Sequence, residues 1–352
     1  MYLHALATAN PSRSFTQKEC YEIAKSPAVR ERLNRRSQIF AQAILRGNSG
    51  IDERQFAVED VPGVFAYSAD QLNEAFRREG PKLASAALTK ALAQIGLSAP
   101  ELDALLICTC TGYLCPGLTS YVAEQLGLRA NAILQDFAGL GCGAAIPTLR
   151  AADALLYANP GAIIATIAVE ICSAAFFLDD DPGVIVSACL FGDGAAAAIW
   201  KNTPGASGAR VDHFSTHHSP SDRDKIRFEQ RNGKLRNLLH PTVPALAADV
   251  VTRLFLDESQ RAGAAPISRI IAHPGGRDVV TALETALPNH DFSASRTVLR
   301  AHGNMSSPSV LFVLEEALRN DRPAAGRDWW LVSFGAGFSA HGCRFQRSEA
   351  SR

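Results

Sequence analysis

Cys142 is the side chain best suited to nucleophilic chemistry in this sequence. It lies between Gly141 and Gly143, just ahead of an alanine-containing segment that is typical of a helix start. Flanking glycines allow a tight turn and the close approach of a substrate. A helix N-terminus offers unpaired N–H groups and the positive end of a dipole, which stabilise a thiolate and lower the pKa of a thiol. The competing interpretation is a structural cysteine buried beneath a helix, but the local sequence favours a nucleophile.

His273 and Asn304 are the candidate partners of this thiol. Imidazole exchanges protons near neutral pH, as a thiol nucleophile requires. Among nine histidines, His273 stands at the end of a predicted strand and before a Pro-Gly-Gly sequence, and that edge of α/β sheets is where ligand sites lie. Asn304 follows Gly303 at a predicted helix start. Its amide either caps the helix or donates to a developing oxyanion, an interaction worth about 3 kcal/mol.

Two other motifs do not indicate a metal or nucleotide site. Cys108-Thr-Cys110 with Cys115 lacks the CxxC spacing, the second cysteine pair and the histidines of a zinc site. The glycine-rich segment Leu190-Phe-Gly-Asp-Gly194 is not followed by the Lys-Ser or Lys-Thr of a phosphate-binding loop. We therefore expect no metal and no nucleotide.

The elements that would position these residues follow a βαβ rhythm. Short apolar runs of strand length, separated by helix-like segments, are typical of a buried parallel sheet. We predict strands at 102–110, 132–137, 162–169 and 195–200, with covering helices over 17–46 and 70–95. Residues 203–237 interrupt the rhythm; they contain a polar His217-His218 loop and the hairpin signal Asn232-Gly233.

The second part of the chain repeats the first. We predict helices at 243–262 and 306–319 and strands at 267–272, 297–301, 329–334 and 339–345. In this order, Cys142 and Asn304 occupy equivalent turns, each after a strand–helix–strand unit and before a helix, which indicates duplication. We divide the chain into an N-terminal half, 1–205, with the cysteine, and a C-terminal half, 206–352, with the histidine and asparagine.

The composition excludes several classes of function. The chain has 352 residues, 47% of them apolar, and 35 basic residues balance 35 acidic ones. This balance gives no net field for nucleic acid or an anionic membrane. The start lacks a signal-peptide pattern, and no apolar run reaches the roughly 18 residues of a membrane span. The eight cysteines lack the spacing of a secreted disulfide framework. We expect a soluble, cytoplasmic protein.

The ordered motifs resemble those of the type III polyketide synthases, the chalcone-synthase-like branch of the thiolase-fold condensing enzymes. The matching segments are Ala7-Thr-Ala-Asn-Pro11, Cys142, Leu190-Phe-Gly-Asp-Gly194, His273-Pro-Gly-Gly276, Gly303-Asn-Met-Ser-Ser307 and Phe334-Gly-Ala-Gly337. The resemblance implies an α/β thiolase fold in which two pseudo-duplicated βαβαβ halves form a five-layered αβαβα core. Ala336 departs from the pattern, because many family members have proline there, and leaves the cavity shape open.

The resemblance also implies a division of labour. Cys142 would take a starter acyl group from coenzyme A, His273 would maintain the thiolate, and His273 with Asn304 would hold the enolate formed when malonyl-CoA loses carbon dioxide. Phe191 matches the phenylalanine where the coenzyme A tunnel meets the cavity. The other expected substrate contacts are Cys110, Cys115, Cys172, Ala175, Gly275, Ser306 and Gly335, and the expected coenzyme A contacts are Arg46 and Arg54. The resemblance implies that coenzyme A thioesters are the substrates and that no cofactor is needed. It also implies a homodimer.

Small residues at the expected cavity positions favour a long acyl starter. Segments 108–117 and 276–279 are also similar to bacterial alkylresorcinol and alkylpyrone synthases, and we expect a fatty acyl-CoA starter. One alternative is a single condensation of the ketoacyl synthase III type, although in that family Gln-Ala-Asn usually follows the histidine. A second alternative is a non-catalytic thiolase-fold partner that binds acyl-CoA, against which the complete Cys-His-Asn set argues.

Overall fold

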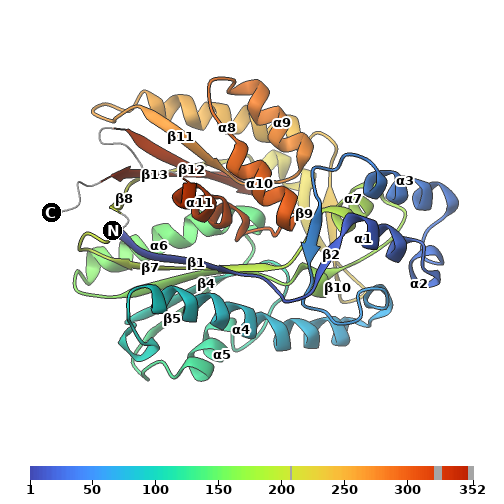
Figure 1. Cartoon of the computed structure of the whole chain (residues 1–352), viewed down its shortest axis with the longest axis horizontal. Coiled ribbons are helices and arrows are strands. Elements are labelled where there is room, and N and C mark those ends of the chain that lie inside the picture. The colour runs from blue at the N-terminus through green and yellow to red at the C-terminus, as the bar shows by residue number, and fades with distance from the viewer. Residues whose placement is uncertain (207, 321–326, 348–352) are drawn as a thin grey trace.

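The structure, a computed structural model, describes residues 1–206, 208–320 and 327–347 (Figure 1). Within these ranges, nine strands form one mixed sheet in the order β11-β12-β13-β8-β1-β7-β6-β4-β5. The strands are β1 (Tyr2–Ala9), β4 (Ala104–Cys108), β5 (Ile133–Phe137), β6 (Ile164–Glu170), β7 (Gly194–Lys201), β8 (Ala209–His218), β11 (Ile267–Ala272), β12 (Asp328–Gly335) and β13 (Ser339–Arg347).

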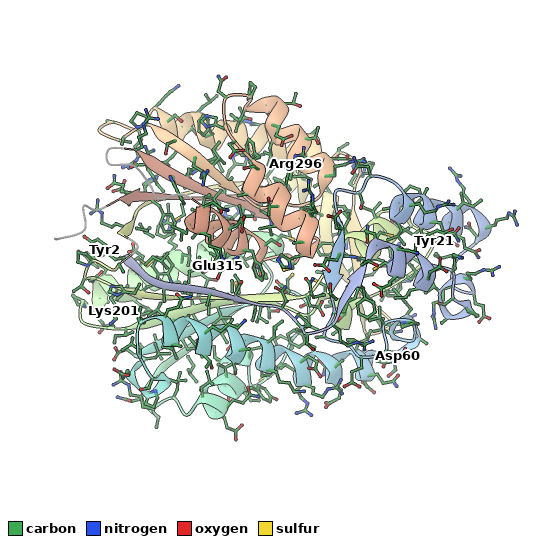
Figure 2. The ribbon with its side chains drawn as sticks, viewed as in Figure 1. Tyr2, Tyr21, Asp60, Lys201, Arg296 and Glu315 are labelled. Carbon is green, nitrogen blue, oxygen red and sulfur yellow. The ribbon has the colours of Figure 1, made fainter. Side chains whose placement is uncertain are left out.

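The sheet consists of two similar halves that meet between β1 and β8. Among the described residues, Tyr2 pairs with Arg210 across this junction, whereas β1 pairs with β7 along its whole length; Tyr2 faces Lys201 at one end of that pair (Figure 2). Each half places its first strand beside its last, as β1 beside β7 and β8 beside β13. The fold is thus a thiolase-like α/β fold. The exact division at residue 205 stays a prediction.

Helices cover both half-sheets and fill the space between them (Figure 1). Helices α6 (Ala145–Ala158) and α11 (Ser309–Asn320) contact strands of both halves. Helices α4 (Ala69–Gln94) and α5 (Leu118–Leu126) cover the first half on its other side, and α8 (Val243–Ser259), with α9 (Arg277–Ala286) against it, covers the second. This is an αβαβα arrangement. Residues 309–314 of α11 are buried consecutively, as expected of a helix enclosed on every side.

The predicted strand at 297–301 is wrong, because this segment belongs to helix α10 (Ser293–His302). Its buried residues are Ser295, Val298 and Leu299. They recur at the three- and four-residue spacing of a helix face, which overrides the β-propensity of the short Thr-Val pair. The second half therefore lacks the counterpart of β5 among its described residues.

The predicted helix over 17–46 is three helices. Pro27 begins the second of them and follows Ser26, where the chain is extended, as the residue before a proline prefers. Asn34 caps the third, because its side chain accepts a hydrogen bond from the Ser37 N–H. The three are α1 (Gln17–Ala24), α2 (Pro27–Arg30) and α3 (Arg35–Arg46).

The remaining elements are short. They comprise α7 (Pro182–Leu190), the strand pair β2 (Ser14–Thr16) and β3 (Glu53–Gln55), the hairpin β9 (Ile226–Arg231) and β10 (Lys234–Leu239), and the 3-10 turns η1 (Val64–Ala66), η2 (Ala99–Glu101), η3 (Gly141–Gly143), η4 (Cys172–Ala175) and η5 (Pro220–Lys225).

The segment that interrupts the rhythm contains the predicted hairpin. Asn232 and Gly233 have φ values of 52° and 73°, as a two-residue turn between antiparallel strands requires. The predicted loop at His217-His218 is wrong, because both residues belong to β8 and pair with β13. The described residues include no cluster of histidine, cysteine or acidic side chains that could hold a metal ion. In the same ranges, no helix is long and apolar enough to cross a membrane.

Candidate active site

Cys142 lies in the turn η3, immediately ahead of α6. Gly141 adopts a left-handed φ of 56° there, which glycine tolerates without strain. The end of β12 packs against this turn: a Cβ added at Gly335 would lie 2.8 Å from the Cys142 nitrogen. Ser333 Oγ also donates to the Gly143 carbonyl at 3.1 Å. Gly335 was expected to contact substrate, but its place is behind the nucleophile, where only glycine fits.

Cys142, His273 and Asn304 converge on one cavity of about 840 Å³, the outer cavity. They come from η3, from the carboxyl end of β11 and from the segment between α10 and α11. The backbone N–H of His273 donates to the backbone carbonyl of Val332 at 2.9 Å and so continues the pairing of β11 with β12. Other side chains that border the outer cavity include Phe40, Ile44, Val186, Leu238, Arg277 and Phe334. The three predicted catalytic residues, far apart in sequence, thus share one space, and Gly275 borders it as well.

Asn304 is not a helix cap, contrary to the alternative weighed from sequence. Helix α11 begins five residues later, at Ser309. The Asn304 backbone instead forms an isolated bridge with Phe191. Its Nδ2 donates to the Gly275 carbonyl at 3.1 Å, and its Oδ1 accepts from the Ser306 N–H at 2.7 Å. Because an amide nitrogen has two hydrogens, one donor of Asn304 remains for a ligand in the outer cavity.

Ser306 contacts the nucleophile directly. Its Oγ donates to Cys142 Sγ at 3.2 Å and also lies 3.2 Å from Cys110 Sγ. Ser306 has a φ of 60°, a conformation that costs energy for a residue other than glycine, and the bond from its N–H to Asn304 holds it there. A hydroxyl donor at this sulfur stabilises the thiolate relative to the thiol.

Burial sets the protonation states of the resting site. It raises the pKa of the Cys142 thiol to about 12 and lowers the pKa of His273 to about 3, since desolvation penalises each charged form. The expected lowering of the thiol pKa is therefore wrong for the cysteine taken alone; α6 begins only at Ala145, and its dipole does not overcome burial. At rest the site therefore holds a neutral thiol at Cys142 and a neutral imidazole at His273.

The Ser306→Ala variant should show a less reactive nucleophile. Loss of a hydrogen bond to a charged sulfur costs about 2 kcal/mol, so alkylation of Cys142 by iodoacetamide at neutral pH should slow roughly thirtyfold. The curve of alkylation rate against pH should also move to higher pH, because the pKa of the Cys142 thiol rises further. Peptide mass spectrometry across pH measures this, with Cys110→Ala, which keeps the Ser306 hydroxyl, as control. An unchanged profile in Ser306→Ala would contradict the contact.

A smaller space, the inner cavity, also borders Cys142. Its volume is about 50 Å³, and its lining includes Cys110, Cys172, Ala175, Val184, Phe228 and Ser306. Phe191 borders both the inner and the outer cavity, at the junction where a gatekeeper was expected. Ile226 and Asn237 of the β9–β10 hairpin also border both; the sequence did not identify them. Cys115 is exposed and borders neither cavity of this chain, so its expected substrate contact stays a prediction.

The two predicted coenzyme A arginines do not border the outer cavity. Arg54 is 3% exposed, and its Nη1 donates to the carbonyls of Ala188 and Phe191, both at 2.9 Å. Arg46 packs over the ring of Tyr21, 5.3 Å from its centre; Figure 2 shows Tyr21 on the N-terminal helices. Among the described residues, the arginine that does border the outer cavity is Arg277, at the start of α9. Its position directly after the Pro-Gly-Gly sequence is the signal that sequence reasoning missed.

Glu170 is a second group that sequence reasoning missed. It is fully buried, and one of its oxygens accepts from the Cys110 and Thr111 N–H groups at 2.9 and 3.1 Å. Its other oxygen accepts from Ser307 Oγ at 2.6 Å. Glu170 therefore ties the end of β4 to the segment that follows Asn304, next to the inner cavity.

Two protein families match the chain. Residues 2–224 match the family described as FAE1/Type III polyketide synthase-like protein. Residues 213–346 match the C-terminal domain of chalcone and stilbene synthases. Together these matches include Cys142, His273 and Asn304.

Individual relatives agree with these matches. The 3,5-dihydroxyphenylacetyl-CoA synthase of Streptomyces toyocaensis is 30% identical over 308 residues, which are 82% of this chain and 78% of the relative. The 1,3,6,8-tetrahydroxynaphthalene synthase of Streptomyces coelicolor is 28% identical over 354 residues, 97% and 91% of the two chains. The crystal structure of that synthase matches this chain with a TM-score of 0.85 at 24% identity, and the match covers 99% of this chain and 100% of the synthase. The structure of PKS-I from the brown alga Ectocarpus siliculosus matches with a TM-score of 0.87 at 25% identity, and the match covers 99% of this chain and 98% of PKS-I.

Proposed function

The chain belongs to the type III polyketide synthases, malonyl-CoA-dependent condensing enzymes, and from this we propose that Cys142 takes a fatty acyl starter from coenzyme A. The thioester is then extended with malonyl-CoA and cyclised to an alkylresorcinol or alkylpyrone. The observation that supports the proposal is the convergence of Cys142, His273 and Asn304 on one cavity. Coenzyme A thioesters act as the substrates, and no further cofactor is needed.

Starter loading needs a proton transfer between two buried groups. His273 takes the proton of Cys142 as the sulfur attacks the thioester carbonyl, and the departing coenzyme A thiolate receives that proton. Neither charged form is stable alone at this depth, so the transfer is coupled to the attack. Ser306, 3.2 Å from the sulfur, stabilises the thiolate while it is present.

Chain extension uses the other two residues of the site. When malonyl-CoA loses carbon dioxide, the electrons of the broken carbon–carbon bond form an enolate. Its oxygen accepts from His273 and from the second N–H of Asn304, as in an oxyanion hole. The enolate carbon attacks the acyl group on Cys142, a carbon–carbon bond forms, and the thiolate leaves. The lengthened chain then returns to Cys142 for the next round.

The inner cavity supports an apolar starter. Small side chains, Cys110, Cys172 and Ala175, surround the space beside the nucleophile. Arg227 borders the same cavity and favours, as a second candidate, a starter with a carboxylate. However, its Nε lies 3.0 Å from Asp224 and its Nη1 3.2 Å from Glu229, so two acidic partners already neutralise its charge.

A competition between starters tests this proposal. With malonyl-CoA present, acyl-CoA starters of increasing length should be loaded and extended, and long chains should displace acetyl-CoA. The products are separated by liquid chromatography and identified by mass spectrometry. If malonyl-CoA alone gives the dominant product and long-chain starters are not loaded, the fatty acyl starter is refuted and the second candidate, a starter with a carboxylate, is favoured.

Strand β5 supports the proposal of a homodimer. It forms one end of the sheet, and its residues 133–136 are exposed on both faces; Ile133 and Leu134 are 41% and 40% exposed. An edge strand with free N–H and C=O groups pairs readily with another strand, and a two-fold axis would set a second copy antiparallel to it.

Sedimentation velocity checks this dimer. The parent should sediment as a dimer, and Leu134→Lys, which places a charge on the exposed edge, should sediment as a monomer. Tyr157→Lys, at an exposed residue of α6, is the control and should remain a dimer. A monomeric parent, or a dimeric Leu134→Lys variant, would refute the role of β5.

A further inference from the structure

A third space, the rear cavity, lies beyond the inner cavity and takes no part in the steps above. Its volume is about 50 Å³. Helices α1, α2, α3 and α7 contribute to its lining, on the side of the molecule where Figure 1 places them together. Apolar side chains dominate this lining; they include Cys20, Val29, Ala41, Leu45, Ile185 and Cys189.

Phe176 and Ala188 border both the inner and the rear cavity. They therefore form the wall that separates the two. The Phe176 ring stacks on Phe65 at a centre-to-centre distance of 5.3 Å and meets Phe56 edge-on at 5.5 Å. The residues just before Phe176, Cys172–Ala175, have small side chains. The wall thus consists of one aromatic ring and the small Ala188 side chain, with apolar surroundings on both sides.

Helix α7 gives the two cavities a common apolar side. Val184 borders the inner cavity, Ile185 borders the rear cavity, and Ala188, one turn further on, borders both. A helix that is apolar on all sides requires apolar neighbours on all sides. A hydrocarbon group in either space would meet this requirement, whereas water would not.

Arg54 is the one charged side chain that borders the rear cavity among the described residues. Its guanidinium lies over the Phe56 ring, 5.1 Å from the ring centre. Its Nη1 donates to the Ala188 and Phe191 carbonyls at the end of α7, which suit a cation. The charge is therefore directed at the helix end, and an apolar occupant of the rear cavity does not displace its hydrogen bonds.

We propose that the rear cavity is a binding site for the distal methylene groups of an acyl chain attached to Cys142, and that Phe176 is the side chain that admits them. The proposal rests on the proposed function. The inner cavity alone is small, and the rear cavity is the apolar space on the far side of the wall formed by Phe176 and Ala188. Rotation of the Phe176 ring joins the two spaces into one channel that begins at the Cys142 sulfur.

Two substitutions test the proposal. Ala41→Leu fills the rear cavity from α3 and should lower kcat/KM for dodecanoyl-CoA by about tenfold or more, as extra methylene groups in an apolar pocket do, while acetyl-CoA is unaffected. Phe176→Ala removes the ring from the wall and should shift the preferred starter to longer chains. Gln42→Leu, on the same helix but bordering none of the three cavities, is the matched control and should keep the parent preference. Thermal unfolding of each variant confirms that it is folded.

The outcomes separate this inference from the function on which it rests. If no acyl-CoA of any length acylates Cys142, the proposed function itself fails. If short starters are loaded but Ala41→Leu lowers short and long starters equally, or Phe176→Ala leaves the length preference unchanged, the rear cavity is not the chain site and only this inference is overturned.

Discussion

The Cys142→Ala variant is expected to form no polyketide while it still decarboxylates malonyl-CoA. Without the sulfur no acyl group is held, and loss of an essential nucleophile lowers turnover by more than about a thousandfold. His273 and Asn304 remain in place to hold the enolate, so malonyl-CoA should yield acetyl-CoA. Removing one buried sulfur atom costs about 1 kcal/mol of folding free energy, so the variant should remain folded. Radiolabelled malonyl-CoA measures carbon dioxide release and product in one assay.

Cys110→Ala is the matched control, because Cys110 lies beside the same Ser306 hydroxyl as Cys142. It should keep measurable condensation. If Cys142→Ala forms polyketide at the parent rate, the nucleophile has been misassigned. If it loses decarboxylation together with condensation, His273 and Asn304 do not act on malonyl-CoA independently of the thiol.

The Asn304→Ala variant should lose decarboxylation more than starter loading. Removal of one oxyanion donor lowers the rate by roughly a hundredfold or more, and this donor acts on the extender. Loading should fall by a smaller factor, because the substitution also removes the Oδ1 atom that holds the Ser306 N–H at 2.7 Å. Single-turnover acylation by acyl-CoA and carbon dioxide release from malonyl-CoA measure the two steps separately.

Ser306→Ala supplies the converse case. It removes the hydroxyl at the Cys142 sulfur and leaves the Asn304 amide intact, so loading should slow and decarboxylation should not. Opposite patterns in the two variants would assign Asn304 to the enolate and Ser306 to the thiolate. Equal loss of both steps in Asn304→Ala would show that Asn304 acts only by supporting its neighbours.

The convergence of Cys142, His273 and Asn304 on one cavity could be predicted because each residue has a local sign in the sequence. Cys142 lies between glycines, His273 precedes Pro-Gly-Gly, and Asn304 follows glycine in a motif shared with a known family. Phe191 was placed in the same way, and the structure puts it at the junction of two cavities. Such positions depend on tight turns, and turn residues are visible in sequence.

The remaining contacts depend on side-chain direction, which the sequence does not show. Arg54 was expected at a cavity mouth, yet it is buried against carbonyl groups at the end of α7. Ser306 was expected to contact substrate and does border the inner cavity, but the contact of its hydroxyl with the Cys142 sulfur was not foreseen. The strand predicted at 297–301 is helical because helical spacing of its buried residues prevails over local β-propensity. In each case the three-dimensional neighbours decide the outcome.

Peptide mapping of the enzyme after incubation with an acyl-CoA starter alone tests the central claim most directly. The parent should carry one acyl group, located on the peptide that contains Cys142, and Cys142→Ala should carry none. Product formation from the same starter while Cys142 remains unacylated, or an acyl group found on Cys110 or Cys172 instead, would contradict the account.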